Sequence, residues 1–184
     1  MGWAATCRME TTMDLSDHVR HMIRDVVDFP KPGIVYKDIT PVLSCPDTLG
    51  RISDWIARTA PANIDTIVGI ESRGFLFAAA LSERLSAGFV PARKAGKLPW
   101  HTVSTSYALE YGNATLEMHR DAITPGSRVL IVDDLLATGG TVRAASALVR
   151  ELGGHVVGTS VLVELCFLNG RATLDTPVKS LVTY

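Results

Sequence analysis

The chain has 184 residues, of which 47% are hydrophobic and 20% are charged, and its formal net charge is −1. This length suits one domain with a full hydrophobic core, and the composition is ordinary for a globular enzyme. The near-neutral charge, with no stripe of Lys or Arg along the sequence, argues against nucleic acid or an anionic membrane as a partner.

The N-terminal part of the chain carries few structural signals. It lacks a basic start followed by a long apolar stretch, and no apolar run in the chain reaches the roughly 18 residues of a membrane span. We predict a loose extension over residues 1–15 and a single domain over residues 16–184. Cys7, Cys45 and Cys166 have no paired spacing, which favours reduced cysteines in a cytoplasmic protein.

The first predicted helix has Ser16 as its candidate N-cap and ends before Pro30. Its apolar residues recur at helical spacing and are Val19, Met22, Ile23, Val26 and Val27. Residues 29–33 contain two prolines and a glycine, so they must form an irregular turn. Residues 34–36 read as extended, and Asp47 opens a second helix.

Strands and helices then alternate along the chain. The predicted strands cover residues 64–70, 88–93, 129–132 and 156–164, with an edge strand over 177–184 and helices over 75–86 and 142–152. This alternation predicts a mostly parallel sheet with right-handed connections and a ligand at the carboxyl ends of its strands.

Two further segments interrupt this alternation. Residues 94–105 are polar and without period, so we predict a mobile loop about 12 residues long, a length that usually indicates function or disorder. Residues 107–111 and 115–119 alternate in polarity on either side of Gly112 and Asn113, which is typical of a β-hairpin.

The stretch over residues 128–141 combines three features. Residues 129–132 are a short apolar run, typical of a strand buried on both faces. Asp133 and Asp134 stand where this strand should end, and residues 137–141 form a Gly-rich turn ahead of a helix. Unpaired backbone N–H groups and the helix dipole make such a turn an anion site. Two acids beside it indicate a hydroxylated, phosphorylated ligand that carries a divalent cation.

By this topology, three loops meet at one edge of the sheet: residues 71–74, residues 93–97 and the turn just described. The first two loops carry four cations, namely Arg73, Arg93, Lys94 and Lys97. Taken singly, each cation is better explained as a solvated surface residue. Their common placement favours contact with a polyphosphate, most of all for Arg73 and Lys97.

The turn does not belong to the commonest nucleotide-binding loops. Gly140 is followed by Thr141 without the Gly-Lys-Ser/Thr of a Walker-type P-loop, and no Gly-x-Gly-x-x-Gly follows the first predicted strand. The ligand is therefore phosphorylated but bound by a different loop chemistry.

Six motifs carry a resemblance to a known family. They are, in chain order, DFPKPGIVYKDITP at 28–41, ESRGFLF at 71–77, RKAGKLP at 93–99, SYALEYG at 106–112, VDDLLATGGT at 132–141 and VELCFLNGR at 163–171. Together they resemble the type I phosphoribosyltransferases, and within that family the adenine-specific members. The resemblance covers nearly all of the chain from residue 16 onward, and six motifs in the right order are more specific than any one of them.

The resemblance implies an α/β fold of the type I phosphoribosyltransferase kind. Its central, mostly parallel sheet is flanked by helices and carries a small hood and a flexible cover made of a loop and a hairpin. The implied substrates are adenine and 5-phosphoribosyl 1-diphosphate, and the products are AMP and diphosphate, as in purine salvage. A homodimer and Mg²⁺ are also implied, with the metal held by diphosphate, ribose and water near Asp133 and Asp134 and by no direct protein ligand.

The resemblance also assigns roles residue by residue. The 5-phosphate would be wrapped by the loop made of Ala137, Thr138, Gly139, Gly140 and Thr141, with Asp133 and Asp134 at the ribose hydroxyls. The diphosphate would be held by Glu71, Ser72, Arg73, Lys94 and Lys97, with a non-proline cis peptide between Ser72 and Arg73.

Adenine would lie between Tyr36 and Leu135, and backbone groups of Val35 and Lys37 would read its edge. Tyr111 is a further implied substrate contact, while Glu110 is the implied catalytic acid or base and Arg73 the implied catalytic cation. Without the motifs, Tyr36 and Leu135 are better explained by core packing, and Glu110 is explained at least as well as part of a solvated strand face.

Three alternatives are weighed against this interpretation. Members that act on 6-oxopurines usually place an acid where Ala137 stands. A regulator that senses phosphoribosyl diphosphate carries a DNA-binding domain ahead of this fold, for which we expect no room before Phe29. An inactive structural protein would not need the motif acids and cations. The chain departs from the family at Tyr36, commonly Phe, and at Ala95 and Trp100, which flank the diphosphate loop and bear on how the cover closes.

Overall fold

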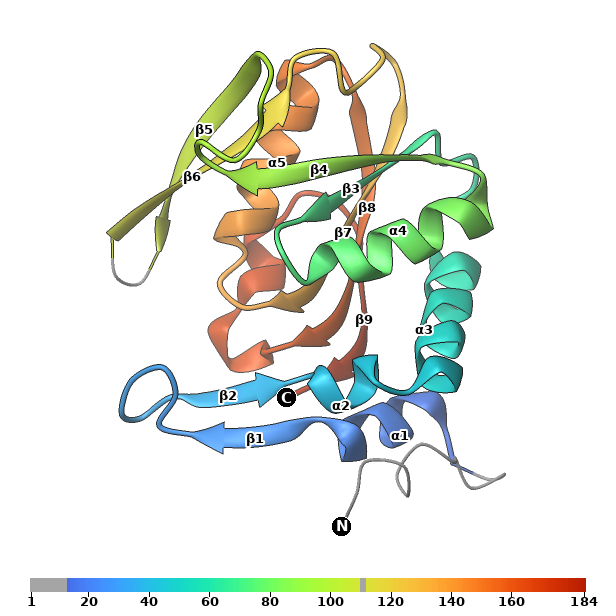
Figure 1. Ribbon diagram of the computed structural model, residues 1–184, viewed down its shortest axis with the longest axis vertical. Helices are drawn as coiled ribbons and strands as arrows, with labels where there is room; N and C mark the ends of the chain where they lie inside the picture. Colours follow the sequence, from blue (N-terminus) through green and yellow to red (C-terminus); the bar gives the residue numbers. More distant parts are fainter. Residues whose placement is uncertain (1–12, 110–111) are drawn as a thin grey trace. The chain divides into compact units, whose positions relative to one another are not determined.

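The computed structural model describes residues 13–109 and 112–184. The chain divides into two compact units, Met1–Trp55 and Ile56–Tyr184, and Figure 1 shows the elements of each in chain order. The prediction of a single domain over residues 16–184, with a loose extension ahead of it, stays a prediction.

The first unit begins with helix α1 (Leu15–Met22) and a two-stranded antiparallel sheet of β1 (Arg24–Val27) and β2 (Val35–Asp38). A short helix α2 (Thr40–Leu43) follows, and α3 (Pro46–Thr59) crosses the boundary between the units. Within the first unit α1 contacts the start of α3, where the buried His18 Nε2 lies 3.0 Å from the hydroxyl of Thr48.

The predicted first helix is wrong at both ends. The side chain of Asp14, not Ser16, caps α1 and accepts a hydrogen bond of 3.1 Å from the backbone N–H of Ser16. The helix ends at Met22, and Val26 pairs with Tyr36 across the small sheet. The β-branched side chains of Val26 and Val27 favour a strand, and pairing with β2 supplies the hydrogen bonds that the helix would have made.

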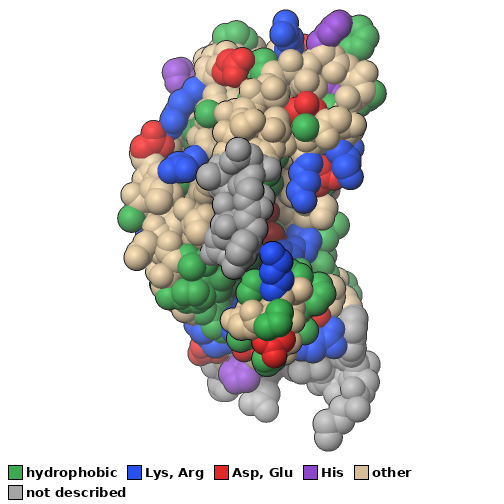
Figure 2. Space-filling model, turned by 90° about the vertical axis from the view of Figure 1, so that its left-hand side faces the viewer, with side chains coloured by type: hydrophobic (Ala, Val, Ile, Leu, Met, Phe, Trp, Pro, Cys, Tyr) green, Lys and Arg blue, Asp and Glu red, His purple; other side chains and the backbone are tan. Residues whose placement is uncertain are grey.

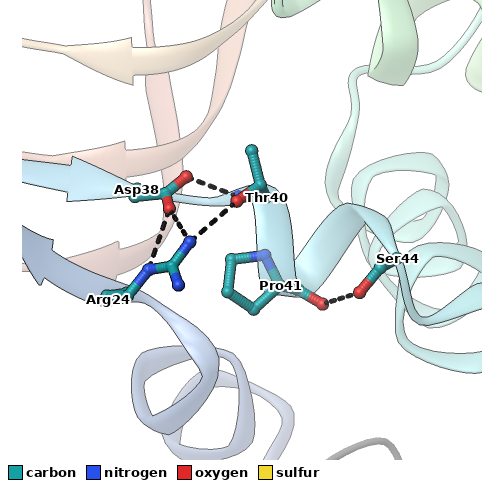
Figure 3. Close-up of polar contacts among 5 residues, drawn as sticks. All are labelled: Arg24, Asp38, Thr40, Pro41 and Ser44. Carbon is teal, nitrogen blue, oxygen red and sulfur yellow. Dashed lines mark hydrogen bonds and ion pairs between the residues drawn. The ribbon is translucent and has the colours of Figure 1, made fainter. Parts of the chain in front are cut away.

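Asp38 joins the end of β2 to the start of α2, as Figure 3 shows. Its carboxylate accepts hydrogen bonds from Arg24 Nη2 at 2.5 Å and from the backbone N–H of Thr40 at 2.9 Å. Burial raises the pKa of Asp38, but the hydrogen bonds from Thr40 and Arg24 outweigh it, so the net pKa lies below the ordinary value. At the other end of α2, Ser44 donates a hydrogen bond of 2.9 Å to the carbonyl of Pro41.

One cysteine also departs from its prediction. Cys45 is disulfide-bonded, whereas Cys166 is free and exposed. Spacing along the sequence does not reveal which cysteines the fold brings together, and so the prediction that all three are reduced is wrong for Cys45.

The second unit is built on a seven-stranded sheet with the order β5-β6-β4-β3-β7-β8-β9. Its strands are β3 (Thr66–Ile70), β4 (Gly88–Lys94), β5 (Thr102–Leu109), β6 (Gly112–His119), β7 (Arg128–Leu136), β8 (His155–Glu164) and β9 (Val178–Thr183). Strands β4, β3, β7, β8 and β9 pair in parallel, whereas β6 pairs antiparallel with both β4 and β5. The predicted mostly parallel sheet, including its edge strand, is therefore confirmed.

Two helices cover this sheet. Helix α4 (Gly74–Leu85) connects β3 to β4, and α5 (Gly140–Glu151) connects β7 to β8. These connections run toward opposite edges of the sheet, so right-handed crossings place the two helices on opposite faces (Figure 1). Every residue of β3 is buried, as expected for a central parallel strand. Among the described residues, none of the helices is long and apolar enough to cross a lipid bilayer.

Three boundaries in the second unit differ from their predictions. Strand β7 continues through Asp133 and Asp134 to Leu136, because its backbone stays paired with β8 at Leu136. Strand β5 begins at Thr102, so the predicted loop over residues 94–105 is shortened to the link between β4 and β5. Gly112 lies in β6, paired with Leu109, and not in the turn of the hairpin. In each case backbone pairing with a partner strand overrides the local polarity.

Candidate functional site

Three loops follow neighbouring strands at the carboxyl edge of the sheet, as the sequence predicts. Residues 71–74 follow β3, residues 95–101 follow β4, and residues 137–141 follow β7. The three strands are parallel neighbours, with Ile70 paired with Ala92 and Gly69 paired with Val132, so their carboxyl ends lie at the same edge of the sheet. Ligands bind at this edge in open parallel sheets.

Glu71 organises the basic side chains of the second loop. Its carboxylate accepts hydrogen bonds from Arg93 Nη2 at 2.9 Å and from the backbone N–H of Lys94 at 3.0 Å. Lys97 Nζ lies 3.8 Å from the same carboxylate, and Arg93 Nη1 donates to the Lys97 carbonyl at 2.9 Å. The hydrogen bond from Arg93 holds the pKa of Glu71 below its ordinary value, which outweighs the opposing effect of burial. Glu71 therefore stays charged and links two loops.

Arg73 contacts the acids at the end of β7. Its Nε lies 2.7 Å from Asp134 Oδ2, while Asp133 accepts a hydrogen bond of 2.8 Å from the backbone N–H of Asp134. Burial and the neighbouring charge of Asp134 raise the pKa of Asp133 well above its ordinary value. Burial also raises the pKa of Asp134, although the positive charge of Arg73 opposes this shift. Two buried acids thus share one nearby cation.

The loop over residues 71–74 approaches β7 very closely. A Cβ added to Gly74 would lie 2.8 Å from the carbonyl oxygen of Val132 and 2.9 Å from Asp133 Oδ1, so only glycine fits at the start of α4. The non-proline cis peptide joins Glu71 to Ser72, one bond earlier than predicted. The motif identifies the loop, but the isomer of each bond depends on backbone geometry that the motif does not encode.

The loop over residues 137–141 ends at the N-terminus of α5. Gly139 is the N-cap of this helix and has a φ of +82°, a left-handed conformation that favours glycine. The first N–H groups of α5 have no partner inside the helix, which suits them to an anion. The hydroxyl of Thr141 lies 3.4 Å from that of Tyr107 on β5, so the hairpin reaches the same loop.

A turn that the sequence interpretation left without a role lies against this loop. The short 3₁₀ helix η3 (Gly170–Thr173) comes so close that a Cβ on Gly170 would stand 2.0 Å from the carbonyl oxygen of Ala137. The hydroxyl of Thr173 lies 3.3 Å from the carbonyl of Thr138. The Asn169-Gly170 pair in the last motif predicts a turn at this position. It does not predict that the turn contacts the loop over residues 137–141.

The remaining predicted site residues fall into three groups. Ser72, Thr138 and the side chain of Lys94 are exposed on the loops above, and Leu135 is half-buried at the end of β7. Val35, Tyr36 and Lys37 lie on β2 of the first unit, where Lys37 Nζ contacts Asp25 at 2.7 Å. Glu110 and Tyr111 lie outside the described residues. The substrate roles of all these residues stay predictions.

Acidic and basic side chains are mixed around the site. Figure 2 shows basic side chains next to acidic ones on the face that it presents. Within the site, Glu71 forms an ion pair with Arg93, and Asp134 forms one with Arg73. No group of three or more His, Cys, Asp or Glu side chains that could hold a metal ion is found in residues 13–109 and 112–184.

Comparison with known proteins gives consistent matches. The model of the phosphoribosyl transferase domain matches residues 36–181. Adenine phosphoribosyltransferase of Thermobifida fusca is 56% identical over 172 residues, which cover 92% of this chain and 98% of that relative. The solved structure of adenine phosphoribosyltransferase from Thermoanaerobacter pseudethanolicus has a TM-score of 0.89 at 48% identity, covering 92% of this chain and 99% of that one.

A third match was solved with ligands. It is adenine phosphoribosyltransferase from Saccharomyces cerevisiae, complexed with an imino-altritol bisphosphate and adenine, with a TM-score of 0.86 at 39% identity. The match covers 91% of this chain and 98% of that one.

Proposed function

The chain belongs to the type I phosphoribosyltransferase family, among its adenine phosphoribosyltransferases, and on this premise we propose which of its residues carry the reaction. The enzyme transfers a 5-phosphoribosyl group from 5-phosphoribosyl 1-diphosphate to adenine, giving AMP and diphosphate in purine salvage. The observation that carries the residue assignment is the continuous stretch from Asp133 to Thr141, where two buried acids precede a helix N-terminus.

The 5-phosphate binds at residues 137–141. The N–H groups at the start of α5 point toward this loop, and the helix dipole favours a negative charge there. Ala137 to Thr141 supply backbone donors, and the hydroxyls of Thr138 and Thr141 supply further ones. This assignment leaves Asp133 and Asp134, directly before the loop, at the level of the ribose hydroxyls.

The diphosphate binds where the other two loops bring their cations. Arg73, Lys94 and Lys97 stand on loops joined through Glu71. Arg73 Nε forms an ion pair with Asp134 Oδ2 at 2.7 Å. Arg73 thus lies beside an acid proposed for the ribose hydroxyls, so it is placed to contact the departing diphosphate attached to the same ribose. Positive charge at the leaving group lowers the barrier to its departure.

The reaction is a displacement at ribose C1. Adenine N9 forms the new bond to C1 as the bond from C1 to the diphosphate oxygen breaks, through a state that resembles an oxocarbenium ion. Most of the rate enhancement comes from placing adenine and C1 in line and from stabilising charge on the diphosphate. The protein does this with preformed loops on a rigid sheet edge.

The donor set fits Mg²⁺ near Asp133 and Asp134. Both carboxylates are buried with raised pKa values, so a divalent cation nearby would stabilise their charged forms, and oxygen donors suit this hard ion. Asp133 and Asp134 would help to hold the metal through water, together with the bound substrate. When bound, Mg²⁺ neutralises charge on the leaving diphosphate.

The β5–β6 hairpin and the preceding loop form a cover. Closure would exclude water, which otherwise competes with adenine for C1. Glu110, from the sequence motif at 106–112, is proposed as the acid or base that handles the adenine proton, and Tyr111 from the same motif as a substrate contact. The contact between Tyr107 and Thr141 supports a cover that reaches the phosphate loop.

From the resemblance to the family, Tyr36 and Leu135 are each proposed as side chains that contact adenine, and backbone groups of Val35 and Lys37 as those that read its edge. Ala137 leaves no acid to serve a 6-oxopurine, which supports adenine as the base. By analogy within the family we also propose a homodimer in the cytoplasm, in which a neighbouring subunit completes the diphosphate site. Light scattering during gel filtration measures the oligomeric state.

The test of the function is AMP formation from adenine and 5-phosphoribosyl 1-diphosphate, with guanine and hypoxanthine as parallel bases. We expect product with adenine and at most traces with the other two. Product formed mainly with guanine or hypoxanthine would contradict the assignment of the base. Binding of 5-phosphoribosyl 1-diphosphate without product from any base would indicate a sensor in place of an enzyme.

A further inference from the structure

The turn Gly170–Thr173 supports the loop over residues 137–141 through direct backbone packing. Added Cβ atoms show how close the two segments are: one on Gly139 would lie 2.7 Å from the carbonyl oxygen of Gly170, and one on Gly170 would overlap Ala137. The hydroxyl of Thr173 donates to the Gly170 carbonyl at 2.8 Å and lies 3.3 Å from the Thr138 carbonyl. One O–H group is thus shared between the turn and the loop.

Arg171 ties this turn to the two outer strands of the sheet. Its Nε donates to Glu164 Oε1 at 2.9 Å, and its Nη2 donates to Glu164 Oε2. Nη1 donates to the carbonyl of Val178 at 2.6 Å, and Nη2 also reaches the hydroxyl of Ser180 at 2.9 Å. Glu164 ends β8, while the other two partners belong to β9.

The surroundings of Glu164 favour its charged form. The residue is 4% exposed, and the hydrogen bonds from Arg171 and then Ser180 lower its pKa against the effect of burial. A charged carboxylate that is buried requires a cationic partner, and the planar fork of the Arg171 guanidinium contacts both oxygens of Glu164. The turn is therefore held at a fixed distance from β8 and β9.

We propose that Arg171, held by Glu164, is a positioning residue for the 5-phosphate of the substrate. Arg171 fixes the turn Gly170–Thr173, and the turn fixes the loop whose N–H groups receive the phosphate. This inference rests on the proposed role of residues 137–141. It makes a selective prediction: binding at the phosphate end of the substrate depends on Arg171, while binding of diphosphate, on loops attached to Glu71, does not.

The experiment measures the affinity of the full chain for ribose 5-phosphate and, separately, for diphosphate by calorimetry. Arg171→Lys keeps a cation beside Glu164 but loses the fork to Val178 and Ser180. Thr173→Val removes the shared hydroxyl and leaves the ion pair intact. Arg150→Gln is the matched control, because it breaks an exposed Arg–Asp pair with Asp175 in the same unit.

We expect Arg171→Lys to weaken ribose 5-phosphate binding about tenfold, and Thr173→Val to weaken it by a smaller factor of about three, the range for lost hydrogen bonds. Diphosphate affinity should stay at the wild-type value in both, and the control should match the wild type throughout. In steady-state kinetics KM for 5-phosphoribosyl 1-diphosphate should rise by more than kcat falls.

Two outcomes would overturn the positioning role of Arg171 and leave the proposed role of residues 137–141 intact. In one, both variants bind ribose 5-phosphate like the wild type. In the other, they lose affinity for ribose 5-phosphate and diphosphate equally, which is the sign of a general structural role. A wild-type chain that binds diphosphate but no ribose 5-phosphate would instead refute the proposed role of the loop, and the inference with it. Should Arg171→Lys fail to fold, Thr173→Val decides the question.

Discussion

Gly170→Ala is the most direct test of how tightly the turn Gly170–Thr173 supports the loop over residues 137–141, the proposed phosphate site. The added Cβ would stand 2.0 Å from the Ala137 carbonyl oxygen and 3.0 Å from Gly139 N, whereas real Cβ atoms essentially never approach below 3.0 Å. The turn and the loop must therefore separate by about 1 Å, because both contacts involve backbone atoms that no rotamer change can move away. Overpacking of this kind costs about 1–3 kcal/mol of stability.

The functional cost should be larger than the stability cost. A displacement of about 1 Å in a substrate-positioning group reduces the rate on the order of 10²-fold, so kcat/KM for 5-phosphoribosyl 1-diphosphate should fall by that factor. Thermal unfolding followed by circular dichroism should show a melting temperature only several degrees lower. Gly88→Ala is the control, since its Cβ would meet no atom closer than 3.7 Å. Wild-type kinetics and melting in Gly170→Ala would show that the turn does not pack on the loop in solution.

Three further substitutions probe the acids of the site. Burial raises the pKa of Asp133 in the folded chain. At pH values between the ordinary pKa and this raised pKa, the folded chain binds a proton that the unfolded chain has released. The free energy of unfolding therefore falls as pH rises through this range. Asp133→Asn should remove this loss and raise the melting temperature at pH 7 while activity drops; a lower melting temperature would refute the reasoning. Asp134→Asn should weaken 5-phosphoribosyl 1-diphosphate binding about tenfold through lost charged hydrogen bonds, and calorimetry giving wild-type affinity would contradict this. Glu110→Ala should lower kcat on the order of 10²–10⁴-fold with substrate affinity nearly unchanged, so unchanged turnover would remove Glu110 from the mechanism.

The parts of the site that are continuous in the sequence could be predicted from it. Asp133 to Thr141 place the two acids directly before the loop over residues 137–141 because a strand, a turn and a helix follow one another without interruption. The polarity pattern also predicted the parallel sheet, since buried parallel strands need unbroken apolar runs. The sequence was sufficient for prediction wherever a single continuous segment both forms the local backbone structure and carries the side chains of the site.

Other features depend on residues that are distant in sequence, and these only the tertiary structure decided. Val26 and Val27 fit a helix by spacing, yet they form a strand because β2 offers backbone partners. Strand β7 likewise continues past the point where its polarity changes because β8 pairs with it. The intrinsic preference of a residue for helix or strand is worth about a fraction of a kcal/mol. Backbone hydrogen bonds to a partner strand, together with the burial of side chains, therefore override it.

The family motifs in the sequence determined which reaction this protein performs, and its apolar pattern determined the layered sheet on which the site stands. The sequence did not determine how the site is held together in three dimensions. The pairing of Arg73 with Asp134, the link from Glu71 to Arg93 and the packing of Gly170 on the loop over residues 137–141 all join segments separated by at least one helix or strand. Such contacts form only when the sheet brings the carboxyl ends of neighbouring strands to one edge, because the distances between the contacting groups depend on strand register and not on sequence spacing.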